Sequence, residues 1–246
     1  MATVTHEITT ASTTNASTYT SGSFTPAVND LLVAMVAATA TVATGSMTGS
    51  AGPAWTLYRS DAFTNGTITT TIYIFVATSL VTSATAQTVT FDCTGDAATG
   101  AIIHVAAIGG ITRTGTSAFK QAASSTFTST PPPSVTLPST SISGNPLIGI
   151  YCATDTGGTV PSAAGAGTNY TAGAGATTSY TNPSTRSNYE YWANPTSGQT
   201  SVAWSSGVGG SATASGRATA FEIDTSAVAE AALPPVIMRS GGIIGV

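Results

Sequence analysis

The residues best suited to chemistry in this sequence are two histidines and a few scattered acids. His104 lies inside an alternating apolar stretch, so we interpret it as a core residue rather than a general base, which needs a carboxylate or nucleophile at a partner spacing. His6 and Glu7 are neighbours on a predicted strand and should project to opposite faces. Asp92 and Asp96 flank a tight loop, but two carboxylates without further acidic neighbours indicate a plain turn rather than a calcium site.

The sequence contains none of the motifs that usually accompany catalysis or cofactor binding. It has no phosphate-binding loop, dinucleotide fingerprint, zinc-ligand spacing or nucleophile elbow. Its ten acidic residues are scattered, so no pair stands out for glycoside hydrolysis. We therefore predict a protein that is not an enzyme, with no catalytic residues, no metal ligands and no cofactor.

Aromatic side chains gather in the second half of the chain, at Tyr180, Tyr189, Tyr191, Trp192 and Trp204. Tyr191 and Trp204 occupy positions that match core residues of the first half, so we expect them to be structural. The remaining ring faces could stack on a sugar, and this keeps a glycan-binding or receptor-binding module as an alternative.

Composition limits the partners that the chain can have. Charged residues make up 7% of its 246 residues, against roughly 25% in an ordinary soluble domain, and the net charge is −4. Such a surface offers no basic footprint for nucleic acid and no polybasic segment for anionic lipid. No apolar run reaches the roughly 18 residues that span a bilayer. The first residues lack the pattern of a signal peptide, so we expect synthesis in a cytosol without export and no membrane partner.

The two cysteines, Cys93 and Cys152, occupy non-equivalent positions in the two halves. One disulfide between them is conceivable, but a protein made in a reducing compartment favours buried free thiols.

The element that organises the chain is an apolar run of strand length that occurs twice. Residues 29–38 open with Asn-Asp and continue as an apolar stretch typical of a strand buried on both faces, and residues 145–154 repeat this form 116 positions later. Other segments correspond at offsets between 113 and 116: Trp55 with Tyr170, 72–77 with 188–193, 88–91 with 201–204, and 100–108 with 216–223. We interpret this as an internal duplication of a β unit.

The predicted fold is therefore all-β, with two tandem antiparallel β-sandwich modules of immunoglobulin-like or jelly-roll type. About seven short strands in roughly 110 residues are typical of a sandwich. Asn65-Gly66 predicts a tight hairpin turn within the first module. We place module 1 at residues 1–111, a polar linker with a Pro-Pro-Pro stretch at 112–134, module 2 at 135–225 and a C-terminal arm at 226–246.

The arm is rich in apolar residues that neither sandwich core requires. We predict that it binds a partner subunit through six of them: Val236, Ile237, Met238, Ile243, Ile244 and Val246. The alternative is that the arm folds back over its own module and covers an edge strand.

Four short segments of the first half, 29–33 (Asn-Asp-Leu-Leu-Val), 54–57 (Ala-Trp-Thr-Leu), 73–77 and 88–91 (Thr-Val-Thr-Phe), resemble the Thr/Ser/Gly-rich β-sandwich modules of tailed-bacteriophage virion proteins. The second half departs from that pattern, with Tyr170 in place of Trp and Pro146 in place of Asp.

The resemblance implies a non-enzymatic structural protein located in the virion, and we expect a capsid decoration or cement protein. Its partners would be other virion proteins, first of all the major capsid protein, and it would form a homo-oligomer, with a trimer favoured. The alternative is a tail fibre or spike module that binds a glycan or receptor.

Overall fold

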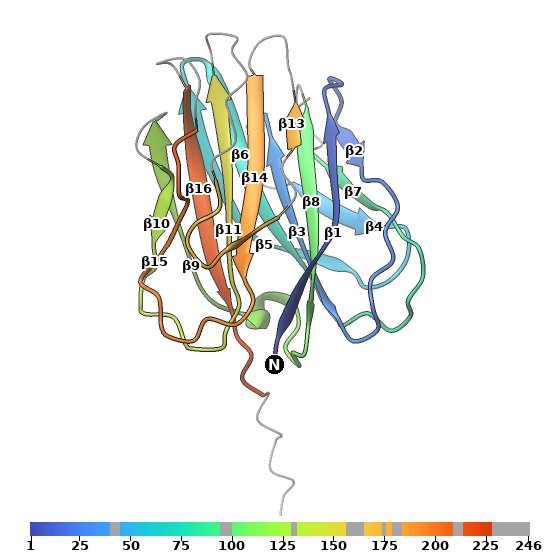
Figure 1. The fold of residues 1–246 in the computed structure, drawn as a ribbon. Coiled ribbons are helices and arrows are strands. Elements are labelled where there is room, and N and C mark those ends of the chain that lie inside the picture. The colour runs from blue at the N-terminus through green and yellow to red at the C-terminus, as the bar shows by residue number, and fades with distance from the viewer. Residues whose placement is uncertain are drawn as a thin grey trace, which may run out of the picture.

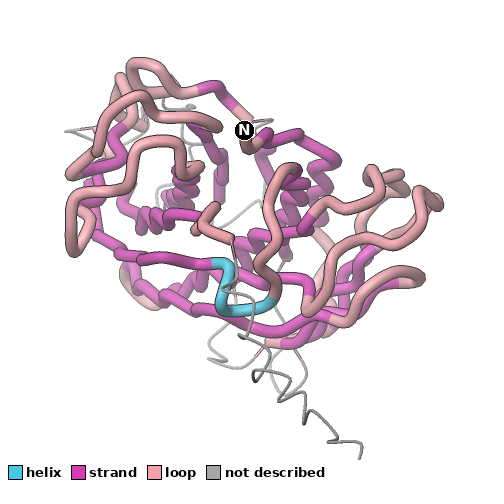
Figure 2. The backbone as a smooth tube through the Cα atoms, turned by 90° about the horizontal axis from the view of Figure 1, so that it is seen from below, coloured by secondary structure: helices cyan, strands magenta, loops and turns pink. Residues whose placement is uncertain are grey.

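The protein is an all-β molecule whose sheets are antiparallel throughout (Figure 1). The structure, a computed structural model, describes residues 1–39, 45–93, 100–128, 132–155, 165–173, 176–178, 184–208 and 214–227. Within these ranges the one helical element is a short 3-10 turn, η1 (Gly115–Ala118), drawn in cyan in Figure 2. The all-β prediction is confirmed.

The first large sheet is built from the first half of the chain. Its strand order is β1-β8-β3-β6-β5. The strands are β1 (Thr3–Ser12), β3 (Leu31–Ala38), β5 (Trp55–Asn65), β6 (Ile68–Ala77) and β8 (Ala101–Gly109). A smaller sheet of order β2-β7-β4 accompanies it, made of β2 (Thr18–Thr20), β4 (Ser46–Gly49) and β7 (Val89–Asp92).

The second large sheet is built from the second half. Its order is β12-β14-β11-β16-β9, and β13 also pairs with β14. The strands are β9 (Phe119–Thr128), β11 (Leu147–Asp155), β12 (Thr171–Ala172), β13 (Ala176–Thr178), β14 (Ser184–Trp192) and β16 (Ala214–Ile223). Its small companion sheet pairs β10 (Ser134–Thr136) with β15 (Ser201–Ala203).

The four sheets form layers, with the two large sheets facing each other at the centre. Ile148 and Ile150 of β11 belong to the same apolar core as the strands of the first large sheet, so the inner faces share one core. The small sheets cover the outer faces: Phe91 of β7 packs on Tyr73 of β6, with ring centroids 5.0 Å apart. On the other side Trp204 packs on Tyr151, with centroids 5.5 Å apart.

This layering explains why the two repeated apolar runs carry no polar face. Strands β3 and β11 lie in the middle of their sheets, and every residue of each is buried. A strand covered on both sides is stabilised by a continuous apolar run rather than by alternation. The prediction of two strands buried on both faces is confirmed.

The hairpin predicted at Asn65-Gly66 is also present. Strands β5 and β6 pair from Trp55 with Ala77 to Asn65 with Ile68. Gly66 adopts a φ of +62°, a conformation that glycine reaches without the steric cost of a Cβ.

The linker predicted at residues 112–134 is wrong over ten of its positions. Residues 119–128 form β9, which pairs with β16 from Phe119 with Ile223 to Thr128 with Ser215. The composition of this segment is similar to that of a linker because β9 is the edge strand of its sheet and needs few apolar side chains. Phe119 and Phe127 are its large buried residues.

The two large sheets have corresponding strand orders, with β3 and β11 in the same central place. Each takes its strands from one half of the chain, which is the order that a duplication predicts. The duplication itself and the module boundaries stay predictions. The inner faces of the two large sheets share one core, while the second half also has a separate core between its large and small sheets.

Candidate functional sites

The six residues predicted to bind a partner subunit, Val236, Ile237, Met238, Ile243, Ile244 and Val246, lie outside the described residues. The described chain ends at Ala227, at the same end of the molecule as the N-terminus (Figure 1). Arg113 holds this end in place: its Nε donates to the carbonyl of Ser226 at 3.1 Å and lies 3.2 Å from a carboxylate oxygen of Asp224. A segment that follows Ala227 therefore starts from an anchored point.

His104 is a fully buried core residue, as predicted. Its Nδ1 lies 2.9 Å from the Thr9 hydroxyl and its Nε2 lies 3.1 Å from the Ser187 hydroxyl. Burial, with a smaller contribution from His6, lowers the pKa of His104 to about 3. The ring is therefore neutral near pH 7, and its two nitrogens are occupied by structural hydrogen bonds.

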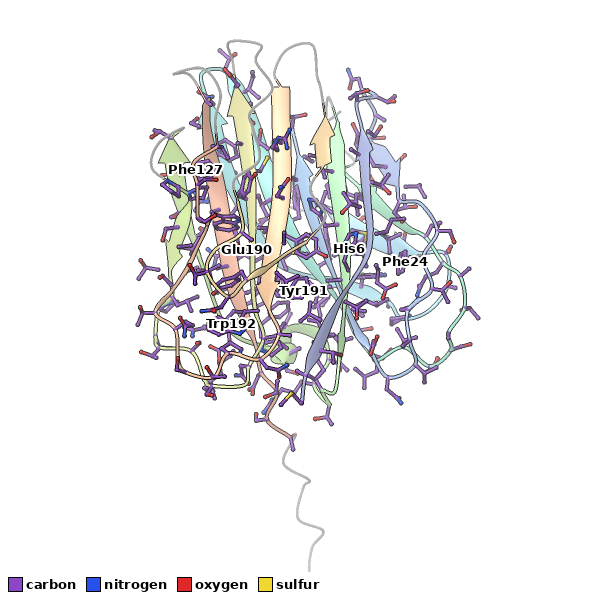
Figure 3. The ribbon with its side chains drawn as sticks, in the orientation of Figure 1. His6, Phe24, Phe127, Glu190, Tyr191 and Trp192 are labelled. Carbon is purple, nitrogen blue, oxygen red and sulfur yellow. The ribbon has the colours of Figure 1, made fainter. Side chains whose placement is uncertain are left out.

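His6 is not the isolated side chain that its neighbours in sequence suggest. A β-bulge follows His6, which is labelled in Figure 3. Its Nδ1 lies 2.6 Å from the hydroxyl of Tyr189. The ring of Tyr189 also tilts against His104, with centroids 5.3 Å apart. Both histidines of the chain thus meet Tyr189, and together with Thr9 and Ser187 they form a polar cluster between the two large sheets. We call this the histidine cluster.

The aromatic residues of the second half are mostly structural. Tyr189 and Trp204 are buried, while Tyr191 packs against the central core. Trp192 is half-buried and meets Tyr170 edge to face, with ring centroids 5.7 Å apart. Tyr180 lies outside the described residues. Among the described residues, Trp192 is therefore what remains of the predicted stacking surface, and it is paired with Tyr170.

Beside that pair lies a buried carboxyl group that the sequence did not single out. Glu190 is 1% exposed, and its Oε2 accepts the Gly167 amide at 2.7 Å. Its Oε1 and the Tyr170 hydroxyl are both buried, and neither has a hydrogen-bond partner among the described residues. Burial raises the pKa of Glu190 to about 7, although the Gly167 amide acts in the opposite direction. Among the described residues, no second acid contributes to that shift.

A second polar cluster joins the large sheets at β5, β9 and β16. Asp61 is 6% exposed and accepts hydrogen bonds from Nε and Nη2 of Arg59, at 2.6 and 2.9 Å. The hydroxyls of Thr219 and Ser124 also donate to it, at 2.9 and 3.1 Å. Nη2 of Arg217 lies 3.7 Å from Oδ1. Burial alone would raise the pKa of Asp61, but Arg59 and the two hydroxyls hold it below its usual value. We call this the aspartate cluster.

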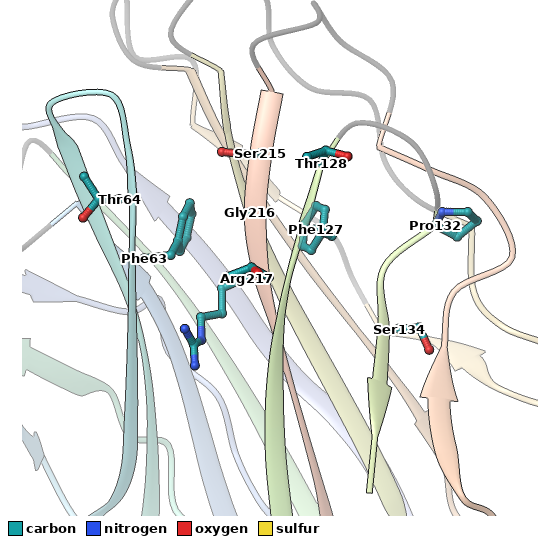
Figure 4. A pocket seen from close by; sticks show the side chains of 10 residues that line it. Phe63, Thr64, Phe127, Thr128, Pro132, Ser134, Ser215, Gly216 and Arg217 are labelled. Atoms are coloured by element: carbon teal, nitrogen blue, oxygen red, sulfur yellow. The ribbon is translucent and has the colours of Figure 1, made fainter.

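Next to the aspartate cluster is a groove of about 600 Å³ between the two halves of the chain (Figure 4). Phe63 of β5 and Phe127 of β9 lie on either side of β16, and the side chain of Arg217 extends toward β5. Gly216 allows Phe127 to approach, because a Cβ there would come within 2.4 Å of the ring. The described residues that line the groove are Phe63, Thr64, Thr126, Phe127, Thr128, Pro132, Ser134, Ser215, Gly216 and Arg217.

The remaining candidate ligands do not converge on a metal site. Within the described part of the chain, no group of three or more His, Cys, Asp or Glu residues is placed to hold a metal ion. Asp96, the second carboxylate of the predicted loop, lies outside that part. Cys93 and Cys152 are buried free thiols, as predicted. Among the described residues, no helix has the length and apolar character to cross a bilayer.

Sequence reasoning missed both clusters and the groove because their members are distant in the chain. His6 and Tyr189 are 183 positions apart, and Asp61 and Thr219 are 158 apart. The available signal was the rarity of charge: an Arg and an Asp two positions apart on one strand, in a chain with 7% charged residues, indicate a buried pair. Comparison with known protein families, with characterised proteins and with solved structures finds no match to this chain.

Proposed function

We propose that the protein is a non-enzymatic structural component of a tailed-bacteriophage virion, and specifically a capsid decoration or cement protein that binds the major capsid protein. The observation that carries the proposal is that the buried polar groups hold the two large sheets together. The histidine cluster and the aspartate cluster both join one large sheet to the other, and neither presents a free nucleophile or base to a substrate.

A third polar contact joins the same sheets where β5 ends. The amide of Asn65 donates to the carbonyl of Thr154 at 2.9 Å, and the hydroxyls of Thr70 and Thr154 lie 3.1 Å apart. Three separate polar contacts across one interface favour a stiff body with a fixed register. Stiffness is what a protein needs if it occupies many equivalent positions on a particle.

The surface supports the same role. In the described part of the chain the large apolar side chains left exposed are Met1, Val28 and Ile142, too few and too scattered for a large apolar interface. The apolar residues from Val236 to Val246 are the natural attachment segment, and the major capsid protein is the partner that we propose for them. We also propose assembly as a trimer.

The experiment is to locate the protein on purified phage particles. Gold-labelled antibody against the protein should decorate the head, and light scattering of the purified protein should give three times the mass of one chain. If the protein is missing from washed particles, the virion proposal fails. Labelling of the tail alone would refute the capsid role and would support the second candidate function, described next.

The second candidate is a tail fibre or spike module that binds a glycan or another receptor. The groove beside Arg217 favours it, because a decoration protein has no need of a concave site of this size. Gold labelling separates the two candidates by position on the particle.

A further inference from the structure

Residues 165–173 form a loosely packed segment that lies against β14 and β15. Two glycines are its only buried residues. Backbone hydrogen bonds tie its ends: the Gly165 carbonyl accepts the Ser205 amide at 2.9 Å, and the Gly173 amide donates to the Tyr189 carbonyl at 2.8 Å. A segment that buries so little apolar surface opens at a low cost in free energy, because buried apolar contacts are what oppose local opening.

The middle of the segment is held by one buried side chain. Oε2 of Glu190 accepts the Gly167 amide at 2.7 Å, while Oε1 has no partner among the described residues. The Tyr170 hydroxyl is also buried without a described partner. Burial, and after it the charge of Glu190, raises the pKa of Tyr170, so the two groups lie close together. A protonated carboxyl has one donor to offer such a hydroxyl, whereas a carboxylate has none.

The ionised form of Glu190 fits the closed segment poorly. A buried carboxylate with a single hydrogen bond has lost its hydration and gained little in return. Burial raises the pKa of Glu190 to about 7, although the Gly167 amide acts in the opposite direction. Opening the segment would return the carboxylate to water and its pKa toward the ordinary value of 4.5. Ionisation of Glu190 therefore favours opening.

Among the described residues, the groups packed around Glu190 carry no charge near neutral pH. The segment itself places Tyr170 beside it. The residues that pair with Glu190 are Gly149 on β11 and Ala172 on β12, and β10 and β15 contain no ionisable residue. On β14 the nearest charged side chain on the same face is Arg186, about 13 Å away along the strand, and it does not shift the pKa of Glu190. A response near neutral pH would thus come from Glu190.

From this geometry we propose that Glu190 is a pH-sensitive latch on the 165–173 segment: the neutral carboxyl holds the segment closed, and its ionisation favours opening. Tyr170 meets Trp192 edge to face, with ring centroids 5.7 Å apart, and lines a cavity of about 290 Å³ beside Trp204. Opening would uncover Trp192 and widen this cavity. The latch goes beyond the proposed function, since it requires neither a virion location nor a receptor.

The direction and size of the response follow from the two pKa values of Glu190. The closed state binds the proton more tightly than the open state, so its advantage is complete below pH 4.5 and is lost as the pH rises to about 7. The ratio of open to closed molecules should rise roughly tenfold per pH unit over most of that interval. From pH 5 to pH 8 the expected increase is therefore on the order of a hundredfold.

Hydrogen exchange of the Gly167 amide, followed by NMR on the whole protein between pH 5 and pH 8, measures this opening. After correction for the intrinsic pH dependence of exchange, its protection should fall by about a hundredfold as the pH rises. The Gly144 amide is the internal control, because it also belongs to a loop glycine and donates to a carbonyl, that of Pro195, at 2.7 Å. Its protection should stay constant. Constant protection at Gly167, or an equal fall at Gly144, would overturn the latch.

Variants assign the response to Glu190. Glu190→Gln keeps an acceptor for the Gly167 amide and carries no charge, so protection of that amide should be high and independent of pH. Glu7→Gln is the matched control, because Glu7 is another acid whose pKa is raised by burial and by Asp30, and it should keep the full response. A fall that persists in folded Glu190→Gln, or that is lost in folded Glu7→Gln, would assign the opening to another group and overturn the proposal. If a variant fails to fold, the pH series of the parent still tests the latch.

Discussion

Replacing Glu190 with Gln should stabilise the protein above neutral pH. The carboxyl group is buried against the Gly167 amide, and one of its oxygens has no hydrogen-bond partner within the part of the chain that the structure describes. Gln has nearly the same shape and keeps an acceptor oxygen for Gly167, but it carries no charge to desolvate. Its amide also supplies a donor in the neighbourhood of the Tyr170 hydroxyl, whose pKa is raised by burial and by the Glu190 charge.

The magnitude follows from the pKa of the group. Burial raises the pKa of Glu190 from 4.5 to about 7. Between those two values the folded protein binds more protons than the unfolded chain, so its stability falls as the pH rises. At about 1.4 kcal/mol per pH unit, the full loss above pH 7 is about 3 kcal/mol. An imperfectly paired Gln amide would return roughly 1 kcal/mol of this, which leaves a net gain of about 2 kcal/mol.

Urea unfolding of both proteins at several pH values between 4.5 and 8 measures this effect. The difference in free energy of unfolding between variant and parent should increase steadily with pH and level off above pH 7. The comparison between pH values matters more than the absolute difference, because it cancels any effect of the substitution on packing. A difference that stays constant over this range would refute the assignment of a raised pKa to Glu190.

Three other predictions follow from the core and from the arm. Because burial lowers the pKa of His104 to about 3, the parent should lose up to roughly 4 kcal/mol of stability as the pH falls from 6.5 toward 3. His104→Gln should remove most of that loss in unfolding measurements and leave particle binding intact. Leu32→Asp and Ile148→Asp should each cost several kcal/mol by calorimetry, since both place an unpaired charge in the shared core, and melting like the parent would contradict the core assignment. Truncation after Leu233 should give a protein that melts normally but no longer binds particles in co-sedimentation, whereas retained binding or loss of folding would refute anchoring by the arm.

The parts of the fold that the sequence predicted are those determined by local pattern. The apolar runs that became β3 and β11 and the Asn65-Gly66 hairpin each depend on neighbouring residues. Strand β9 was missed because an edge strand of Ser, Thr and Ala has the composition of a loop, and it becomes a strand only by pairing with β16. Its pairing energy comes from a partner almost a hundred residues away in the chain.

The candidate sites were less predictable for the same physical reason. The apolar residues of the first large sheet indicate that its strands are buried, but they do not indicate which part of the chain covers them. The sequence therefore does not reveal that Tyr189 lies against His104. The contact between Asp61 and Thr219 depends equally on how two sheets meet. Sequence analysis correctly treated His104 as a core residue because that conclusion requires only its own strand.

The two polar clusters are explained better by the alignment of the two large sheets that they specify than by the free energy of folding that they contribute. Burying Asp61 costs desolvation energy, which Arg59 and the hydroxyls of Ser124 and Thr219 offset far enough to hold the pKa of the carboxyl below its usual value. An apolar residue of similar size could nevertheless stabilise the interface as well, because it would need no such compensation. The hydrophobic effect that holds apolar sheet faces together has no preferred direction, so apolar burial alone specifies their alignment weakly. A carboxylate that needs donors from β5, β9 and β16 at once is satisfied in one register only. We infer that the aspartate cluster sets the alignment of the two large sheets, and this alignment in turn shapes the groove between Phe63 and Arg217.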